Sequence, residues 1–383
     1  MNVLQVSLQL YKDFRCIGGV CPVNCCHGWD RVVWTKAEVD KLMSAQCSEQ
    51  LDKLRQTGFI PVDEDFLIDE KEQRCHFLNN DNLCSIQLEL GEEYLSCTCR
   101  RYPRKNILNN GVNYYCLGLS CYEVLSQLIS NEDCTKLCIE LRKITNKTVF
   151  NYIEDGNVIQ ETPALKYRKD IMMLLYDVIA DKSYSVETGI TLGALAMQKI
   201  SQFAEKGEAD RIPEVISAIK PQIKNQAQIA KLESIKPNYS LKHSVASKIF
   251  SKVVMLTNLL DSNGNPDNEL YRRGEELFAR IISDRPFAKR NLMLGALFDL
   301  KMPYFSEEFS LYENYCYYAL YAAFINFIAA GTALADNSEQ SFKMLLGKMS
   351  RYYIHSKDYI NDALAAMKEH NCTSPAYLAS LIK

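Results

Sequence analysis

The chain has 383 residues, of which 47% are hydrophobic and 24% charged, and its formal net charge is −3. This composition predicts a folded protein with a sizeable core, and the length suits about two domains. The near-neutral charge excludes a broadly basic nucleic-acid-binding protein and an acidic disordered protein, so we expect no nucleic-acid partner.

Cysteine is the one residue type with an unusual abundance. Thirteen of the fifteen cysteines lie between Cys16 and Cys138, and only Cys316 and Cys372 follow. Such density indicates either a secreted disulfide scaffold or an intracellular metal site. The first ten residues carry no positive charge, polar residues interrupt their apolar run, and Cys16 follows closely. This start does not resemble a secretory signal, so we favour a metal site in a cytoplasmic protein.

The N-terminal third predicts short elements separated by glycine and proline. Its clearest helix runs over Thr35–Gln56, with Thr35 as N-cap and Glu38 completing a capping box. Extended pieces are expected at Arg31–Trp34 and Phe66–Asp69. A region so rich in loops buries little apolar surface by itself, and a bound metal would supply the missing cross-links.

Long periodic segments follow from Thr162, where Pro163 suits the first position of a helix. We therefore predict a mainly α protein, in which a loop-rich, metal-binding N-terminal region packs on a helical bundle. The expected domains are residues 1–150 and 160–383, with Asn151–Glu161 as a linker. Further helices are expected near residues 185–206, 210–232, 241–261, 267–284, 310–331, 337–354 and 357–369.

The longest apolar stretch, Tyr315–Gly331, contains Cys316 and Asn326 and five alanines. A membrane-spanning helix needs about 20 strongly apolar residues. We expect a buried core helix here and no membrane span.

The cysteines form an ordered series with short spacings. Clustered thiolates of this kind suit soft metals, as zinc sites or iron–sulfur clusters. Cys47, Cys134, Cys138, Cys316 and Cys372 are better explained as small buried hydrophobes. The series reads Cys16-x4-Cys21-x3-Cys25-Cys26, Cys75-His76-Phe77-Leu78, Cys84-Ser85-Ile86-Gln87, Cys97-Thr98-Cys99-Arg100-Arg101-Tyr102-Pro103-Arg104, and Cys116 with Leu119-Ser120-Cys121.

Taken in order over roughly residues 12–122, these motifs resemble the flagellin lysine-N-methylases. The Cys-Cys, Cys-x-Phe-Leu and Cys-x-x-Tyr-Pro elements also resemble small zinc- or iron-chelating domains. Further along, Glu313-Asn314-Tyr315 is similar to the methylase family as well.

The resemblance implies methyl transfer from S-adenosylmethionine to lysine side chains of flagellin, and an iron–sulfur cluster. A 4Fe–4S cluster takes four thiolates. We rank Cys75, Cys84, Cys99 and Cys121 first, with Cys16, Cys21, Cys25 and Cys26 as a competing or second set; zinc remains the alternative metal.

The cysteine spacing does not match the radical S-adenosylmethionine signature, and no glycine-rich dinucleotide-binding turn is present. Polar transfer to a neutral lysine is therefore expected. Glu313 and Tyr315 are the catalytic candidates, although the tyrosines here also fit a buried helix face. Arg100 and Arg104 are candidates for the cofactor carboxylate or an acidic stretch of flagellin, and a solvated turn is the simpler alternative.

Two other functions remain open from the sequence. The first is a non-enzymatic zinc or iron–sulfur module that mediates protein interactions. The second is a redox protein that uses its cluster for electron transfer.

Overall fold

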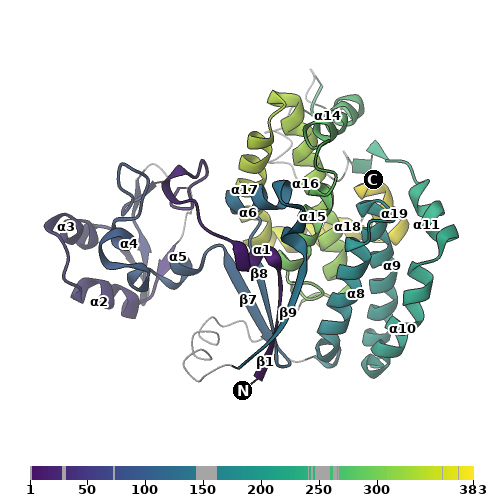
Figure 1. The fold of residues 1–383 in the computed structure, drawn as a ribbon, viewed down its shortest axis with the longest axis horizontal. Helices are drawn as coiled ribbons and strands as arrows, with labels where there is room; N and C mark the ends of the chain where they lie inside the picture. Colours follow the sequence, from purple (N-terminus) through teal and green to yellow (C-terminus); the bar gives the residue numbers. More distant parts are fainter. Residues whose placement is uncertain are drawn as a thin grey trace. The chain divides into compact units, whose positions relative to one another are not determined.

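A computed structural model describes residues 2–27, 32–71, 74–143, 162–239, 241–242, 245, 259–261, 265, 267–306, 308–355, 357–369 and 371–383. The chain forms two compact units (Figure 1). We call them the helical unit (Met1–Asp13, Asn106–Ser120 and Val124–Lys383) and the cysteine unit (Phe14–Lys105 and Cys121–Glu123). The mainly α class expected from the sequence is confirmed.

The units do not follow the domain boundary that we expected near residues 150–160. The first thirteen residues and Asn106–Ser120 belong to the helical unit, because they contribute strands to its sheet. Pairing between strands so far apart in the chain leaves no local sequence signal. The expected linker, 151–161, lies outside the described residues.

The sheet of the helical unit has four strands in the order β7-β8-β1-β9. Strand β1 pairs with β8 in parallel, with Leu4 opposite Val112, and with β9 antiparallel, with Val6 opposite Ile139. Three short helices precede or follow these strands in the chain: α1 (Gln9–Asp13), α6 (Tyr122–Ser130) and the 3-10 helix η3 (Glu132–Thr135). The strands are β1 (Asn2–Leu8), β7 (Arg104–Asn109), β8 (Val112–Leu117) and β9 (Leu137–Lys143).

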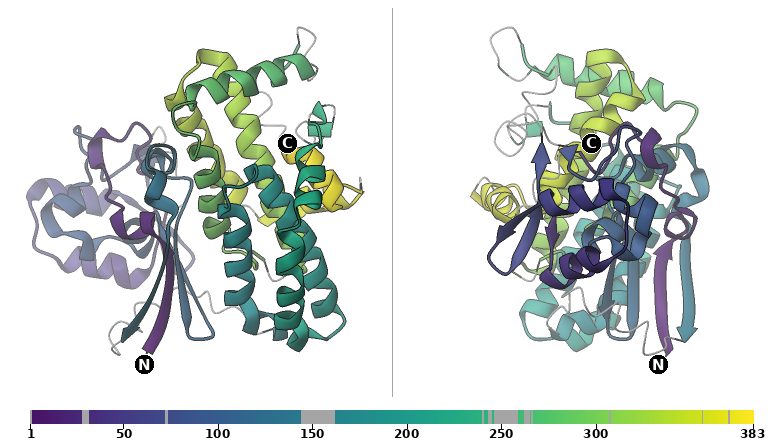
Figure 2. Two further views of the ribbon diagram at one scale, coloured as in Figure 1. Left: turned by 45° about the vertical axis from the view of Figure 1, so that its right-hand side comes forward. Right: turned by 90° about the vertical axis from the view of Figure 1, so that its left-hand side faces the viewer.

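Most other described residues of this unit are helical, and α8, α9 and α10 lie side by side (Figures 1 and 2). The expected helix over 210–232 is two helices, because Asn225 starts a new one by accepting a hydrogen bond from the Gln228 backbone N–H. Helices α15 and α19 were not expected, and the segment predicted at 241–261 lies mostly outside the described residues. The bounds are η4 (Pro163–Tyr167), α8 (Arg168–Ala180), α9 (Val186–Glu205), η5 (Ala209–Arg211), α10 (Ile212–Ile223), α11 (Gln226–Glu233), α14 (Asn268–Ile281), α15 (Ala288–Asp299), α16 (Leu311–Asp336), α17 (Glu339–His355), α18 (Lys357–Glu369) and α19 (Pro375–Ile382).

Helix α16 is the centre of the helical unit and packs against α9, α14, α15, α17, α18 and α19. A capping box between Ser310 and Glu313 starts it, and Asn337 ends it in the left-handed conformation, with φ of 53°. By length and hydropathy this helix could cross a membrane, but 89% of its apolar window is buried inside the protein. Its burial agrees with the core helix expected from the sequence.

The cysteine unit is built from short helices and strands around a small apolar core. Trp34, Leu42, Leu51, Phe77 and Ile86 form that core, against which several partly buried cysteines pack. The strands form a three-stranded sheet in the order β2-β4-β3 and a separate β5-β6 pair. The elements are η1 (Gly18–Val20), β2 (Val33–Trp34), α2 (Lys36–Ser44), α3 (Glu49–Thr57), β3 (Phe59–Val62), β4 (Asp65–Ile68), β5 (Glu70–Lys71), β6 (Arg74–Cys75), α4 (Ser85–Leu90), η2 (Glu92–Tyr94) and α5 (Cys97–Arg101).

The helix predicted over Thr35–Gln56 is two helices, α2 and α3. Its predicted start is confirmed, because Thr35 and Glu38 form the reciprocal capping box. The chain leaves the helix after Ser44 and re-enters it at Glu49, with Ser48 as the second N-cap. Expected extended pieces appear as β2 and β4, which pair with each other.

Candidate metal centre and polar sites

Five thiols of the cysteine unit lie in one neighbourhood: Cys25, Cys26, Cys75, Cys84 and Cys99. We call them the thiol cluster. A hydrogen bond with Cys25, then burial, raises the pKa of Cys26, and Cys75 and Cys84 act in the same direction. Burial raises the pKa of Cys99 to about 12, with smaller contributions from Cys75, Cys84 and Cys25. Cys26 and Cys99 thus each interact electrostatically with Cys25, Cys75 and Cys84.

Backbone pairing brings these cysteines together. The Cys75 N–H donates to the Cys26 carbonyl over 2.9 Å, and Leu78 forms an isolated β-bridge with Cys84. Cys84 then occupies the N-cap of α4. Burial raises the pKa of its thiol, while backbone N–H groups at the start of α4 act to lower it. A thiolate at this helix start would be stabilised by those N–H groups.

Cys21 lies near Cys25 of the thiol cluster and near Cys16. Burial raises the pKa of Cys21, and Cys25, Cys16 and Glu123 raise it further. Glu123 is two residues from Cys121, so the segment that carries Cys121 lies beside Cys21. The structure thus groups three of the first-ranked thiols with Cys25 and Cys26 from the competing set. The final choice of ligands stays a prediction.

The thiol cluster suits a soft metal by its chemistry, since several sulfur donors converge beside backbone N–H donors. Metal binding would displace the protons that the raised pKa values retain on Cys26, Cys84 and Cys99. Across the described residues, however, no three His, Cys, Asp or Glu side chains stand at metal-ligating spacing. The fold therefore brings the sulfur donors into one region, but their spacing does not define which of them are metal ligands.

The two arginines proposed for a cofactor carboxylate have different surroundings. Arg100 is exposed in the last turn of α5. Arg104 donates from Nη2 to the Phe14 carbonyl over 3.3 Å, and its guanidinium lies 5.0 Å from the centre of the Phe14 ring. Arg104 thus has a packing role within the cysteine unit, and a shared anion site with Arg100 stays a prediction.

Glu313 and Tyr315, the catalytic candidates, lie at the start of α16. The Glu313 carboxylate forms an ion pair with Lys368 and accepts from the Ser310 N–H over 2.7 Å. Burial acts to raise its pKa, but these partners hold the pKa below its ordinary value. Tyr315 is fully buried, and its hydroxyl donates to the Ile190 carbonyl over 2.8 Å. Both side chains have structural partners, and their catalytic roles stay predictions.

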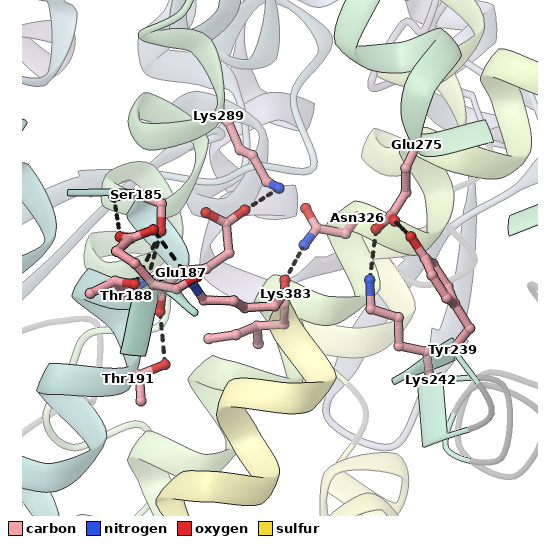
Figure 3. A network of polar contacts seen from close by, with 12 residues as sticks. Ser185, Glu187, Thr188, Thr191, Tyr239, Lys242, Glu275, Lys289, Asn326 and Lys383 are labelled. Atoms are coloured by element: carbon pink, nitrogen blue, oxygen red, sulfur yellow. Dashed lines mark hydrogen bonds and ion pairs between the residues drawn. The ribbon is translucent and has the colours of Figure 1, made fainter. Parts of the chain in front are cut away.

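A network of charged side chains in the helical unit was not expected from the sequence (Figure 3). Lys242, only 3% exposed, pairs with Glu275 over 2.7 Å. Its ammonium also lies 5.1 Å from the Tyr239 ring centre and 4.8 Å from that of Tyr271. A lysine in a helical segment ordinarily indicates an exposed face, so the sequence gives no signal for this buried ammonium.

Two further ion pairs of this network join α9 to α15, and α11 to the residue that follows α19. Lys289 forms an ion pair with Glu187, and Lys383 lies 3.5 Å from Glu233. Burial acts to raise the pKa of Glu187, but Lys289, with smaller contributions from the Glu187 backbone and Lys383, holds that pKa below its ordinary value of 4.5. These pairs join the ends of helices that are distant in sequence (Figure 3).

A groove with a volume of about 620 Å³ runs between α9, α10 and α11. Its lining mixes apolar and polar side chains, and it includes Phe203 with two nearby cations. The Lys199 ammonium lies 5.5 Å and the Arg211 guanidinium 4.8 Å from the Phe203 ring centre. An aromatic ring with adjacent cations can contact a planar or anionic ligand.

The helical unit identifies the class of protein. Residues 173–381 match the family model described as the FliB lysine N-methylase C-terminal domain. This match covers more than half of the chain, so the protein belongs to the FliB lysine N-methylase family. The resemblance seen in the sequence is confirmed.

Individual relatives come from Salmonella. The chain is 24% identical over 253 residues to the lysine-N-methylase of Salmonella typhimurium, a match covering 61% of this chain and 57% of the relative. The lysine-N-methylase of Salmonella choleraesuis matches to the same extent. The flagellar biosynthetic protein FliU of Salmonella muenchen is 28% identical over 135 residues, which cover 32% of this chain and 76% of FliU. The match thus spans little more than half the length of either lysine-N-methylase, and no solved structure matches the chain.

Proposed function

We propose that this protein is a cytoplasmic, S-adenosylmethionine-dependent lysine N-methyltransferase that acts on flagellin. The observation that carries the proposal is the family match over residues 173–381. The names of the relatives support it, since two are lysine-N-methylases and a third is a flagellar biosynthetic protein.

The proposed reaction is a direct displacement at the methyl group. The neutral lysine nitrogen attacks the sulfonium methyl, a C–N bond forms as the C–S bond breaks, and S-adenosylhomocysteine leaves. The methylated ammonium then loses one proton to a base or to water. Holding the nitrogen in line with the methyl is the main requirement of such a reaction.

Glu313 and Tyr315 are our proposed residues for contacting the lysine. Glu313 already pairs with an ammonium group, that of Lys368, in this structure. A carboxylate so placed could hold a substrate ammonium and accept its proton. Tyr315 lies two residues further along α16.

The cysteine unit is proposed to hold a 4Fe–4S cluster on four thiols of the thiol cluster and its neighbours, with zinc as the alternative. Bound there, the group would supply cross-links that hold the short elements of this unit together. Arg100 and Arg104 are proposed to contact an anionic group beside this region.

Methyl transfer can be measured directly. The protein, purified without oxygen, is incubated with flagellin and S-adenosylmethionine carrying a deuterated methyl group, and flagellin peptides are analysed by mass spectrometry. We expect deuterated methyl groups on lysine side chains. Glu313→Gln keeps the shape of the side chain and should lower the rate by about 10²–10⁴-fold if this residue is the base.

Flagellin left unlabelled by metal-replete protein that retains its fold would contradict the proposal. The non-enzymatic metal module would then be favoured, because the thiol cluster exists independently of any reaction. A Glu313→Gln variant with normal turnover would instead remove only this residue from the mechanism.

A further inference from the structure

Arg168, the first residue of α8, is an unusual buried cation. It is 1% exposed, and its Nη2 donates to the Lys301 carbonyl. Its Nε and Nη1 atoms are buried and have no hydrogen-bond partner among the described residues. Within the part of the chain that the structure describes, no carboxylate forms an ion pair with it.

Two other partly buried arginines of the helical unit have acceptors for their guanidinium groups. Arg290 donates to the carbonyls of Ile179 and Tyr184 over 2.5 and 2.6 Å. Arg285 pairs with the Glu339 carboxylate over 2.5 Å. The two unsatisfied donors of Arg168 set it apart from both of these residues.

A buried cation without a counter-ion is costly, and proteins ordinarily pair or neutralise it. Burial lowers the pKa of Arg168 to about 10, so the group is still charged at neutral pH. The guanidinium lies 5.2 Å from the centre of the Tyr114 ring, which offsets part of this cost. An aromatic face does not satisfy the N–H groups at Nε and Nη1.

The surroundings of Arg168 offer further hydrogen-bond donors. Tyr114 and Cys116 on β8 and Tyr304 after α15 interact with it electrostatically. The Tyr304 and Thr162 hydroxyls are 3.0 Å apart, and both residues are partly exposed. A guanidinium with unsatisfied N–H groups at Nε and Nη1 and with neighbouring hydroxyls can donate charge-assisted hydrogen bonds to a carboxylate.

We propose that Arg168 binds the carboxylate of a small-molecule ligand and that, resting on the proposed function, this ligand is the methyl donor. S-adenosylmethionine carries its carboxylate at the end of a slender amino-acid chain. Arg168 is only 1% exposed. A slender ligand can reach a group buried this deeply more readily than the surface of a folded protein can. The partly exposed Tyr304 and Thr162 mark the side from which it enters.

The test compares two ligands that share an adenosine thioether. S-adenosylhomocysteine has the amino-acid carboxylate, and 5′-methylthioadenosine lacks the amino-acid group. Calorimetric titrations are made with metal-replete wild-type protein, Arg168→Met and Arg168→Lys. Arg290→Lys is the matched control, because both of its paired donors already have protein acceptors.

We expect wild-type protein to prefer S-adenosylhomocysteine. Arg168→Met should weaken binding of S-adenosylhomocysteine by about 10- to 100-fold, the usual effect of losing hydrogen bonds to a charged group. The same variant should change 5′-methylthioadenosine binding less than threefold, and Arg168→Lys should fall between. Arg290→Lys should leave the preference between the two ligands unchanged.

Equal loss for both ligands, or an unchanged preference in folded Arg168 variants, would overturn the assignment. If both variants fail to fold, equal binding of the two ligands by wild-type protein overturns it, and a strong preference for the carboxylate supports it. The Phe203→Ala variant tests the groove beside α10 as the alternative site. If this variant loses the preference for S-adenosylhomocysteine and the Arg168 variants keep it, the ligand carboxylate binds in that groove. No binding of S-adenosylhomocysteine to wild-type protein would remove the proposed function as well, whereas binding without dependence on Arg168 removes only this inference.

Discussion

At the scale of single residues, Tyr315 shows how a candidate catalytic group can also be a packing device. Its hydroxyl donates to Ile190, and a Cβ added at Gly193 would stand 2.1 Å from that hydroxyl oxygen. The close approach of α9 and α16 at this point thus depends on the absence of a side chain at position 193.

Tyr315→Phe removes one buried hydrogen bond and leaves the Ile190 carbonyl without this donor. We expect the free energy of unfolding to fall by about 1 kcal/mol, measured by urea denaturation. A catalytic role would be supported if methyl transfer falls by more than the loss of folded protein can explain. Unchanged stability would contradict the packing role of the hydroxyl.

The pair between Glu187 and Lys289 predicts a dependence of stability on pH. The pKa of Glu187 is lower in the folded protein than its ordinary value of 4.5. The pair therefore stabilises the fold at pH values above about 4.5, and this contribution is lost as the pH falls through the lower folded value. The Lys289 side chain is 35% exposed, so solvent partly screens the pair.

We expect Glu187→Gln to be less stable than wild-type protein at pH 7. The difference should narrow as the pH is lowered from 5 to 3, because wild-type Glu187 then becomes neutral too. The difference is measured by urea unfolding of both proteins between pH 7 and pH 3. If the difference in unfolding free energy between the two proteins stays constant down to pH 3, the charge of Glu187 does not stabilise the fold.

At the scale of elements, the cysteine unit shows how tertiary contacts divide a helix. Local propensity is continuous over residues 35–56, with neither glycine nor proline. Arg55 donates to the carbonyls of Leu42 and Ala45 over 2.7 and 2.8 Å, at the end of α2. Glu89 accepts from the Ser48 N–H over 2.9 Å. Ser48 is a local signal for the start of α3, but the partners at the break between α2 and α3 come from α3 and α4, so the local pattern alone does not show the break.

Helices α14 and α16 meet through a glycine. A Cβ at Gly274 would stand 2.4 Å from the backbone oxygen of Ala330, which cannot move without displacing α16. We expect Gly274→Ala to lower the free energy of unfolding by about 1–3 kcal/mol. Gly347→Ala is the control, because its Cβ would meet its nearest atom at 3.3 Å and should cost less. Equal effects at the two positions, measured by thermal or urea unfolding, would contradict the tight contact.

At the scale of the whole molecule, the thiol cluster predicts how metal content and stability are linked. Cys75→Ser and Cys84→Ser should each lower the bound metal and destabilise the cysteine unit, because a bound centre contributes folding energy. Cys372→Ser, which removes a buried thiol of the helical unit, should retain full metal content. Iron, zinc and acid-labile sulfide are measured per chain after purification without oxygen.

Roughly four irons with matching sulfide would support a 4Fe–4S cluster. Zinc without sulfide would favour a structural scaffold. Equal metal content in all three variants would show that Cys75 and Cys84 are not ligands.

Features that depend on neighbouring residues could be predicted from the sequence alone. These include the helix start at Thr35, which rests on a capping box between Thr35 and Glu38, and the apolar core helix at Tyr315–Gly331. The ordered cysteine motifs also indicated the family, because residue type and order are enough to carry that resemblance.

Which distant groups meet depends on the tertiary fold. Folding brings Cys25 and Cys26 near Cys75, Cys84 and Cys99, and it pairs β1 with β8 and β9. It also buries Arg168 with two nitrogen atoms that no described residue accepts from. A thiol or an arginine has the same local signal whether it is exposed, packed or ligating. Its chemistry is set by burial and by partners that arrive from far along the chain, and these exist only once the chain has folded.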